Sequence, residues 1–464
     1  MENAEVVRDW RGRSYFVGPV PADRSRMLWL ALAAMAAISP LQYGFAALLA
    51  GSASGLFLLA ACVVCQAAGA LPALHLVRRG RVSVRTALGL GAALTTVGLL
   101  TLALLSTTSG LAPGAAPAYA LALLGYAVLG GLGVGAVYGV CSEAVSSWYP
   151  DRPAVRVSLA TGAFGYGAVP LLVWAGIAPS ATPVAFAVAA ALAAVAIGAA
   201  ARFLRLPPRH WWPETVDPRA HALDAAILRR NPAAVKQFGL AQAMRTRALP
   251  ALAVILACAG AVSLFDVVAV AATGSWGALA LMVALNGAGR SAAMRCSEVF
   301  GRRQVLAAVL TVLAAGQVLL LAAMQDVTTA GPFRELAATG VTPESAASGL
   351  AQAAPGLAAH EAVLAQAGGP LLWLGAIAAG LGGGAFYPLV ASLVRDFFGV
   401  ERVGEIHAVV YSAKAVAGVM AVALALLALS APATALLIAG GLAALPALGT
   451  LRLRAPGLPA TIPL

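Results

Sequence analysis

Twelve long apolar segments, separated by turns and loops, constrain this sequence more than any other feature. A helix that crosses the hydrocarbon core of a bilayer needs about 20 mostly apolar residues. Segments of this kind extend near 27–49, 53–77, 84–106, 117–144, 154–177, 183–204, 248–272, 275–298, 302–324, 369–396, 403–429 and 431–452. Only 10% of the residues are charged, whereas a soluble chain carries about 25%. We therefore predict an all-α integral membrane protein with twelve transmembrane helices.

The charged residues lie on alternate sides of these segments. The N-terminal tail, the 205–247 loop, the C-terminus and the turns near 80, 154, 300 and 398 hold nearly all the arginines, whereas the short loops on the opposite side hold no charged residue. Because cytoplasmic loops carry the excess of Lys and Arg, both termini and the 205–247 loop are predicted to be cytoplasmic, in a cell inner membrane. The net charge of +12 is thus spread over short runs between segments, so we expect no nucleic-acid partner.

A glycine-rich sequence recurs in the two halves of the chain. Gly131–Tyr138 reads GLGVGAVY and Gly380–Tyr387 reads GLGGGAFY, with six of eight positions identical at an offset of 249. The matched pair predicts a parallel repeat, in which two six-helix bundles are related by an axis along the membrane normal and hold the substrate between them. The predicted divisions are a cytoplasmic tail 1–26, a bundle 27–204, a cytoplasmic loop 205–247, a bundle 248–453 that includes an external loop 325–368, and a cytoplasmic tail 454–464.

Residues that could carry other chemistry are scattered. Cys62 and Cys65 form a CxxC, but it lies inside an apolar segment without a second pair or nearby histidines, so no metal site is predicted. The five histidines are dispersed, mostly at or beyond the segment ends. We predict neither an enzyme nor a cofactor-binding protein.

Two cations lie where charge is costly: Arg290 in the eighth segment and Lys414 in the eleventh. A charge at the bilayer centre costs about 2.5–3.5 kcal/mol on insertion scales. At 1.5 Å per residue the two side chains start about 12 and about 16 Å from the cytoplasmic ends of their helices, hence at similar height. Each could reach the interface or pair with an acid, but the only comparable acid, Asp266, lies nearer the outer face. We predict that an anionic substrate supplies the counter-charge, and we regard Asp266 as a candidate proton carrier.

The repeat places both cations in the C-terminal half alone. Lys414 shifted by 249 falls on Gly165, and Arg290 shifted by 221, the offset between the cytoplasmic turns, falls on Gly69. The fork of arginine and the point charge of lysine suit carboxylates. Tyrosines could line the remaining walls and donate hydrogen bonds. The candidates are Tyr43, Tyr138, Tyr166, Tyr387 and Tyr411.

The turn after the eighth segment resembles a known signature. Asn286-Gly287-x-Gly289-Arg290, followed by Ser297-Glu298-x-x-Gly301-Arg302-Arg303, is similar to the pattern between helices eight and nine of the major facilitator superfamily, which usually ends Ser-Asp-x-x-Gly-Arg-Arg. Within that superfamily the chain looks most like the oxalate/formate antiporter family. The supporting residues are Trp148–Arg152, Phe397–Gly399 and Lys414.

The resemblance implies the major facilitator fold and a site in which Arg290 and Lys414 bind carboxylate in an aromatic cavity. Glu298 would replace the signature aspartate and pair with cytoplasmic arginines at a gate that includes Gly301, Arg302 and Arg303. In the first-half signature Val77 occupies the position of the acid, so the chain departs from the family pattern at that turn.

These features together predict a secondary active transporter of a small organic anion, an oxalate- or formate-like mono- or dicarboxylate. The bundle 27–204 would rock against the bundle 248–453. Because an empty carrier would hold two unneutralised cations, its return across the membrane would be disfavoured, so the protein would exchange one anion for another. Proton-coupled monocarboxylate symport and export of hydrophobic compounds are the alternatives. The expected partners are the anion and the lipid bilayer, and a single chain is expected to suffice.

Overall fold

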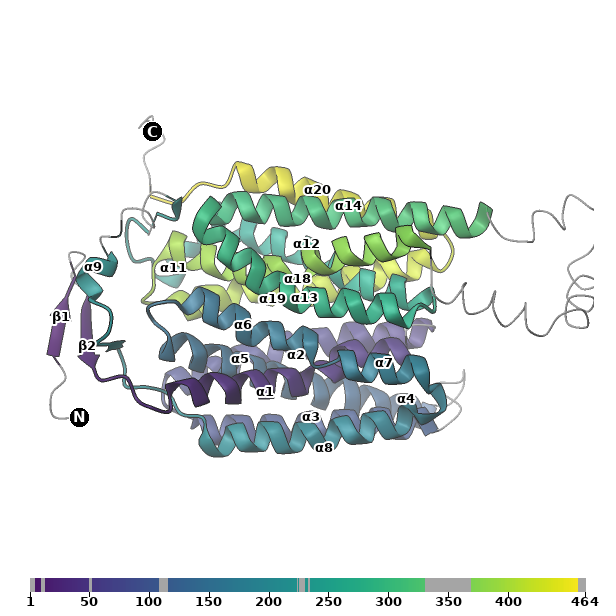
Figure 1. The fold of residues 1–464 in the computed structure, drawn as a ribbon, viewed down its shortest axis with the longest axis horizontal. Helices are drawn as coiled ribbons and strands as arrows, with labels where there is room; N and C mark the ends of the chain where they lie inside the picture. Colours follow the sequence, from purple (N-terminus) through teal and green to yellow (C-terminus); the bar gives the residue numbers. More distant parts are fainter. Residues whose placement is uncertain are drawn as a thin grey trace, which may run out of the picture.

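The structure is a computed structural model that describes residues 5–9, 13–49, 52–107, 116–222, 224, 230–232, 234–329 and 369–457. Most of the predicted external loop and the end of the C-terminal tail lie outside these residues. The described chain is almost entirely helical, and its helices form two bundles that lie side by side with their axes roughly parallel (Figure 1).

The first half of the chain forms the lower bundle of Figure 1. Its spanning elements are α1 (Arg24–Tyr43) extended by η1 (Gly44–Ala47), α2 (Ala53–Arg78), α3 (Val84–Thr107), the continuous run of α4 (Ala116–Leu121), η2 (Ala122–Gly130) and α5 (Gly131–Trp148), the pair α6 (Pro153–Tyr166) and α7 (Val169–Ile177), and α8 (Thr182–Phe203), preceded by η3 (Pro179–Ala181). The fifth span breaks between α6 and α7 because Gly167 lies directly against the carbonyl of Ala36 and Pro170 removes a helical N–H donor.

The second half forms the upper bundle. A short helix, α11 (Leu240–Met244), leads into it. Its spanning helices are α12 (Ala248–Ala272), α13 (Trp276–Phe300), α14 (Arg302–Thr329), α18 (Pro370–Phe398), α19 (Val403–Ala428) and α20 (Pro432–Leu451).

The helices have the length and surface of membrane spans. Within the described residues, eleven helical segments are long and apolar enough to cross a bilayer. The remaining long helix, α13, has 25 residues, and its hydropathy is lower because it carries Asn286, Arg290 and Arg295. Large apolar side chains such as Leu445 are exposed on the outside of the bundles. The chain is therefore a multi-pass membrane protein, and the predicted twelve-helix, two-bundle fold is confirmed.

The two glycine runs pack equivalent helices. On α5, a side chain at Gly135 would collide with the carbonyl oxygen of Gln66 on α2. On α18, a side chain at Gly384 would collide with the carbonyl oxygen of Asn286 on α13. Small residues allow such close approach of helix backbones in membranes. The runs therefore join the second and fourth spans of one bundle and the matching eighth and tenth spans of the other.

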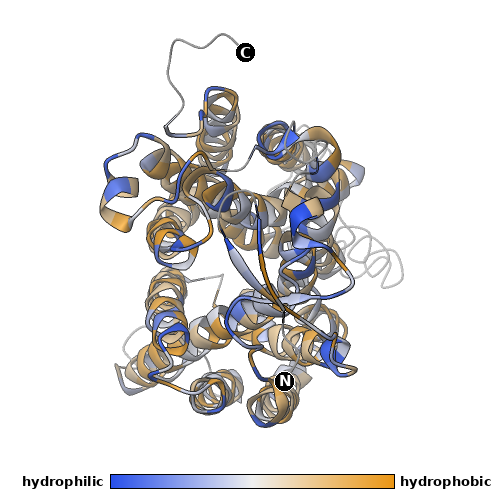
Figure 2. Ribbon diagram, turned by 90° about the vertical axis from the view of Figure 1, so that its left-hand side faces the viewer, coloured by the Kyte–Doolittle hydropathy of each residue, from blue (hydrophilic) through white to orange (hydrophobic). Residues whose placement is uncertain are grey.

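A small sheet, which the sequence reading did not anticipate, lies at one end of the molecule. Strands β1 (Glu5–Arg8) and β2 (Ser14–Gly18) pair antiparallel, and β3 (Trp211–Pro213) from the central loop pairs parallel with β2. The sheet and the short helix α9 (Pro218–Ala222) mark what we call the terminal end, which faces the viewer in Figure 2. The central loop and the N-terminal tail are thus bound to each other.

Candidate functional site

A small cavity lies between the two bundles, and most of the predicted site residues line it. The first bundle contributes Gln42, Tyr43, Tyr138 and Phe164, and the second contributes Ser263, Leu264, Arg290, Tyr387, Tyr411 and Lys414. The cavity volume open to water is about 10 Å³, which is roughly the space of one water molecule.

The bundles touch on both sides of this cavity. At the terminal end Arg78 of α2 packs directly on Gly404 of α19. Toward the other end, a Cβ at Gly176 of α7 would lie 2.6 Å from the Cβ of Trp276 on α13. The bundles are therefore in contact on both sides of the cavity, and both cations are buried.

Lys414 reaches from the second bundle to the first. Its side chain is buried, and its Nζ donates to Oε1 of Gln66 on α2 at 2.8 Å and to the Tyr411 hydroxyl at 3.4 Å. The ring centres of Tyr138, Phe164 and Tyr411 lie 5.7–6.0 Å from Nζ, within the range of cation–π attraction. Among the described residues, the ammonium group therefore contacts only neutral groups.

Arg290 crosses the interface in the same direction. Nη1 donates to the backbone carbonyl of Thr161 on α6 at 3.0 Å, and Nη2 donates to Oδ1 of Asn286 at 3.2 Å. Nε is buried and has no hydrogen-bond partner in the described part of the chain. The hydroxyl of Tyr43, from the first bundle, also donates to Oδ1 of Asn286 at 3.4 Å. This guanidinium, like the ammonium, is bound by neutral acceptors.

Each cation is held by an amide side chain, and the two amides occupy matching places in the two bundles. Gln66 on α2 binds Lys414, and Asn286 on α13 binds Arg290. The backbone carbonyls of the same two residues receive the packing glycines Gly135 and Gly384. A glycine of the repeat thus packs on the backbone of each amide residue, and the side chains of Gln66 and Asn286 extend toward the cavity region.

No ion pair joins either cation to a carboxylate among the described residues. Asp266 does not line the cavity; its Oδ1 accepts a hydrogen bond from Nε2 of Gln317 on α14 at 2.7 Å. The predicted separation of Asp266 from the two cations agrees with this geometry.

Aromatic rings surround the cations, with Phe164 in the middle. The ring centre of Phe164 lies 5.9 Å from the Arg290 guanidinium carbon and 5.8 Å from Lys414 Nζ. Tyr43 and Tyr138 pack on Phe164, and Tyr138 is stacked on Tyr411 at 5.8 Å. Of the predicted tyrosines, four line the cavity and Tyr166 does not. The residue is 41% exposed, and its ring packs on Gly287 at the outside of the bundle crossing.

The cations lack counterparts in the first bundle for a steric reason. A Cβ at Gly165, the position that matches Lys414, would lie 2.6 Å from the backbone nitrogen of Gly287, where α6 crosses α13. A side chain at Gly69, the position that matches Arg290, would collide with the carbonyl of Leu132. Both positions are occupied by neighbouring backbone.

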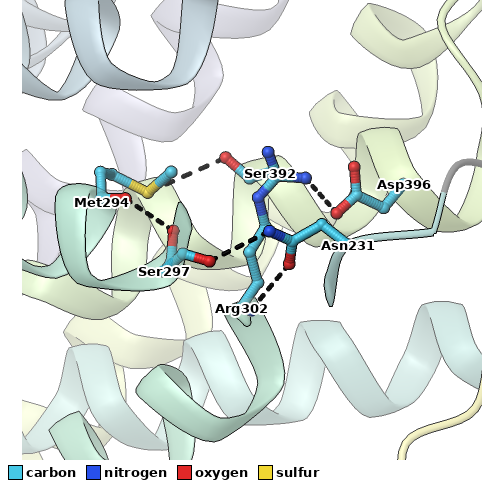
Figure 3. A network of polar contacts seen from close by, with 6 residues as sticks. All are labelled: Asn231, Met294, Ser297, Arg302, Ser392 and Asp396. Atoms are coloured by element: carbon cyan, nitrogen blue, oxygen red, sulfur yellow. Dashed lines mark hydrogen bonds and ion pairs between the residues drawn. The ribbon is translucent and has the colours of Figure 1, made fainter. Parts of the chain in front are cut away.

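The signature turn between α13 and α14 is held by a different acid from the one expected. Glu298 is exposed and forms no ion pair among the described residues, whereas Arg302 pairs with Asp396 at the end of α18 (Figure 3). Asn231 of the central loop accepts from the Arg302 backbone N–H at 2.9 Å and donates to the carbonyl of Ser297 at 3.0 Å. Glu298 faces away because it follows the buried Ser297 by one residue, about 100° around the helix.

The other two signature residues have structural roles at the same turn. Gly301 ends α13 with φ of 91°, which favours glycine. Nη1 of Arg303 donates to the carbonyl of Leu453 at 2.6 Å. The turn is therefore tied to α18, to the central loop and to the residues after α20.

The first-half turn, whose signature lacks its acid, has a separate ion pair. Val77 is buried, and the next residue, Arg78, pairs through Nε with Glu143 of α5 at 2.8 Å. Because Arg78 also packs on Gly404, this pair lies where the bundles meet at the terminal end. Sequence reasoning missed Arg78 and Glu143, since it sought the acid next to the turn rather than on α5.

Sequence reasoning also missed several residues of the site itself. A signal existed for the amides and Gln42, because polar side chains inside apolar spans are uncommon. No comparable signal marks Phe164 or the Thr161 carbonyl, whose roles depend on how α6 crosses α13.

Several solved structures share this architecture. The xylose transporter XylE from E. coli, in an inward open conformation, has 15% sequence identity and a TM-score of 0.59 over 92% of this chain and 95% of its own. A POT family transporter in complex with 5-aminolevulinic acid has 12% identity and a TM-score of 0.60 over 92% and 96%. The E. coli fucose:proton symporter FucP has 14% identity and a TM-score of 0.54 over 92% and 98%.

These likenesses confirm the fold class, since each covers nearly all of both chains. Neither a family model nor a curated protein sequence matches this chain. The resemblance to the oxalate/formate antiporters stays a prediction.

Proposed function

We propose that this protein is a secondary active transporter that carries a small organic anion across a membrane by alternating access. The observation that supports this function is the pair of buried cations, Arg290 and Lys414, which extend from one bundle to neutral acceptors on the other. Amide and carbonyl oxygens accept hydrogen bonds from Nζ of Lys414 and from Nη1 and Nη2 of Arg290. Nε of Arg290 has no partner, and neither positive charge has a counter-ion among the described residues.

The energetics favour an anionic ligand. A charge taken out of water costs several kcal/mol after relaxation, unless a counter-charge compensates it. A carboxylate at the cavity would meet the fork of Arg290 and the point charge of Lys414. Two cations suit an oxalate-like dicarboxylate, or a formate-like monocarboxylate with partial compensation.

The cavity favours a small, flat substrate. Its volume is close to that of one water, and aromatic rings form much of its wall. Even with some expansion on binding, such a site suits an anion of a few atoms. The alternative of a hydrophobic export substrate fits poorly, because Arg290, Lys414 and Gln42 would present buried polar groups to an apolar ligand.

The contacts between the bundles support alternating access. The three central hydrogen bonds between bundles are Lys414–Gln66, Arg290–Thr161 and Tyr43–Asn286. An anion that binds the two cations would compete with the Lys414–Gln66 and Arg290–Thr161 hydrogen bonds. The ligand that neutralises the site would therefore also weaken the contact between the bundles. We propose that residues 27–204 and 248–453 rock about these crossings, with exchange as the net reaction.

The arginine distribution supports a cytoplasmic position for the terminal end in a cell inner membrane. The cavity is completed by residues of one chain, which supports a functional monomer.

The chain offers a matched test, because Lys414 and Lys236 are its only two lysines. Lys236 is exposed and lies over the ring of Phe238, far along the chain from the cavity residues. Purified protein is reconstituted in liposomes loaded with unlabelled oxalate, and uptake of labelled oxalate is followed with formate and other small carboxylates as competitors. We expect exchange by the unmodified protein and by Lys236→Gln, and its loss in Lys414→Gln.

The lysine variants also distinguish a wrong role for Lys414 from a wrong substrate class. Equal exchange by Lys414→Gln and Lys236→Gln would refute the role of Lys414. The absence of exchange of any small carboxylate by the unmodified protein would refute the proposed substrate class.

A further inference from the structure

A second polar site lies inside the C-terminal bundle, apart from the cavity. Asp266 on α12 and Gln317 on α14 are each 1% exposed, and Nε2 of Gln317 donates to Oδ1 of Asp266 at 2.7 Å. Neither residue lines the cavity between the bundles. The pair connects two helices within one bundle, so it is not part of the contact that the proposed rocking must break.

Two buried oxygen atoms of this pair lack a donor. Oδ2 of Asp266 and Oε1 of Gln317 have no hydrogen-bond partner in the described part of the chain. Buried polar atoms of this kind are few in folded proteins, and each needs an explanation. Here the two orphans are both acceptors and belong to side chains already bonded to each other.

Among the described residues, no ion pair joins Asp266 to a cation. The charged and titratable groups on the helices around α12 are engaged elsewhere, exposed or at helix ends: Arg290 binds Thr161 and Asn286, Lys414 binds Gln66, Arg302 pairs with Asp396, Arg303 binds the carbonyl of Leu453, His407 packs on Tyr411, Arg295 is exposed, Asp326 lies at the end of α14, and Arg395, Glu298 and Glu405 lie in the terminal turns of α18, α13 and α19. An ionised carboxylate at this depth would be an uncompensated buried charge, which is strongly destabilising.

One proton resolves both observations. We propose that Asp266 and Gln317 form a proton-binding site, in which Asp266 carries a proton on Oδ2 and donates it to Oε1 of Gln317. The carboxylate takes the proton from water and forms one O–H bond, and the reverse step returns it. The product is a cyclic pair of a carboxylic acid and a carboxamide, in which both orphaned oxygen atoms gain a partner. This proposal goes beyond the anion site and does not depend on the substrate.

The site is connected to the cavity through α12. Ser263, one turn before Asp266, lines the cavity and accepts a hydrogen bond from Nδ2 of Asn286 at 3.3 Å. Asn286 in turn binds Arg290. Movement of α12 that follows a change at Arg290 would therefore disturb the contact with Gln317, and water that enters there could take the proton. The arrangement with the pair buried retains the proton, and one that admits water to the pair releases it.

Infrared difference spectroscopy of the purified full chain at neutral pH tests the protonation directly. We expect the unmodified protein to show the carbonyl stretch of a protonated carboxylic acid that Asp266→Asn loses. An asparagine can make both hydrogen bonds to Gln317, so this variant should keep the unmodified thermal midpoint. Asp396→Asn is the matched control: Asp396 is paired with Arg302, so its removal should leave the band unchanged.

A second variant guards against misfolding of the first. In Gln317→Leu the acid carbonyl loses its Nε2 donor, so the band should shift rather than vanish. A spectrum without a carboxylic acid band, or a band that neither substitution alters, would overturn the proposal.

A transport measurement then relates the proton to function. In liposomes, we expect uptake by the unmodified protein to change with pH and uptake by Asp266→Asn to lose that dependence. An identical pH dependence of the two would overturn release during transport. The band reports on Asp266 whether or not oxalate is carried, so failure here is distinguishable from failure of the anion assignment.

Discussion

Gln66 offers the sharpest test of the uncompensated charge on Lys414. Its Oε1 accepts the hydrogen bond of Lys414 Nζ at 2.8 Å, and the residue is 1% exposed. Gln66→Glu replaces this neutral acceptor with a carboxylate of nearly the same shape. The lysine then has an internal counter-ion, and a substrate anion must compete with it.

The size of the effect follows from the distance. At the 2.8 Å of this hydrogen bond, Coulomb's law with an effective dielectric constant of about 20 gives an attraction of about 6 kcal/mol. Removing the new carboxylate from water costs several kcal/mol. If about 3 kcal/mol remain, the apparent affinity for the transported anion falls roughly a hundredfold, since 1.4 kcal/mol is a factor of ten.

The assay is anion exchange in liposomes over a range of substrate concentrations. Gln66→Met is the matched control, because methionine removes the acceptor but adds no charge. We expect Gln66→Glu to raise the apparent KM far more than Gln66→Met does, while its thermal midpoint stays at or above that of the unmodified protein. Equal KM values for the two variants would refute the counter-ion reasoning, even if both transport poorly.

Two further substitutions test the geometry. Arg290→Lys keeps the charge but loses the fork that reaches both Thr161 and Asn286, so we expect at least a tenfold loss of kcat/KM; unchanged exchange would show that only charge matters there. Gly165→Ala places a Cβ 2.6 Å from the Gly287 nitrogen, so we expect lost transport and a lower thermal midpoint. Gly198→Ala, where nothing lies within 4 Å, should leave both unchanged, and equal behaviour of the two variants would contradict the crossing.

The fold could be predicted from the sequence because span length and apolar content are local properties. Arg290 and Lys414 could be found for the same reason, since a charge inside an apolar segment is visible without knowledge of its neighbours. The small sheet could not, because it joins the N-terminal tail to Trp211–Pro213, nearly two hundred residues away.

The contacts of the site residues were harder to predict from the sequence than their positions in the membrane helices. Glu298 was chosen as the acid of the signature turn, yet Asp396 pairs with Arg302 because the end of α18 lies beside that turn. Tyr166 was chosen as a wall residue, whereas Phe164 is the ring between the cations. Residues two apart on a helix differ by about 200° in direction, so only one of Phe164 and Tyr166 could face the cavity. The position of Gly165 at the crossing of α6 and α13 determines that it is Phe164.

The site is best understood as a break in the repeat. The packing glycines place Gln66 and Asn286 at equivalent points, so the fold provides two amide positions, one in each bundle. The cations that use them both come from the second bundle, because neighbouring backbone occupies the matching positions Gly165 and Gly69 in the first. Lys414 therefore binds its amide across the interface, whereas Arg290 binds its amide within its own bundle and reaches the first bundle through the Thr161 carbonyl. An anion between them would stay with the second bundle while the first moves, so transport should depend more on Gln66 than on Asn286.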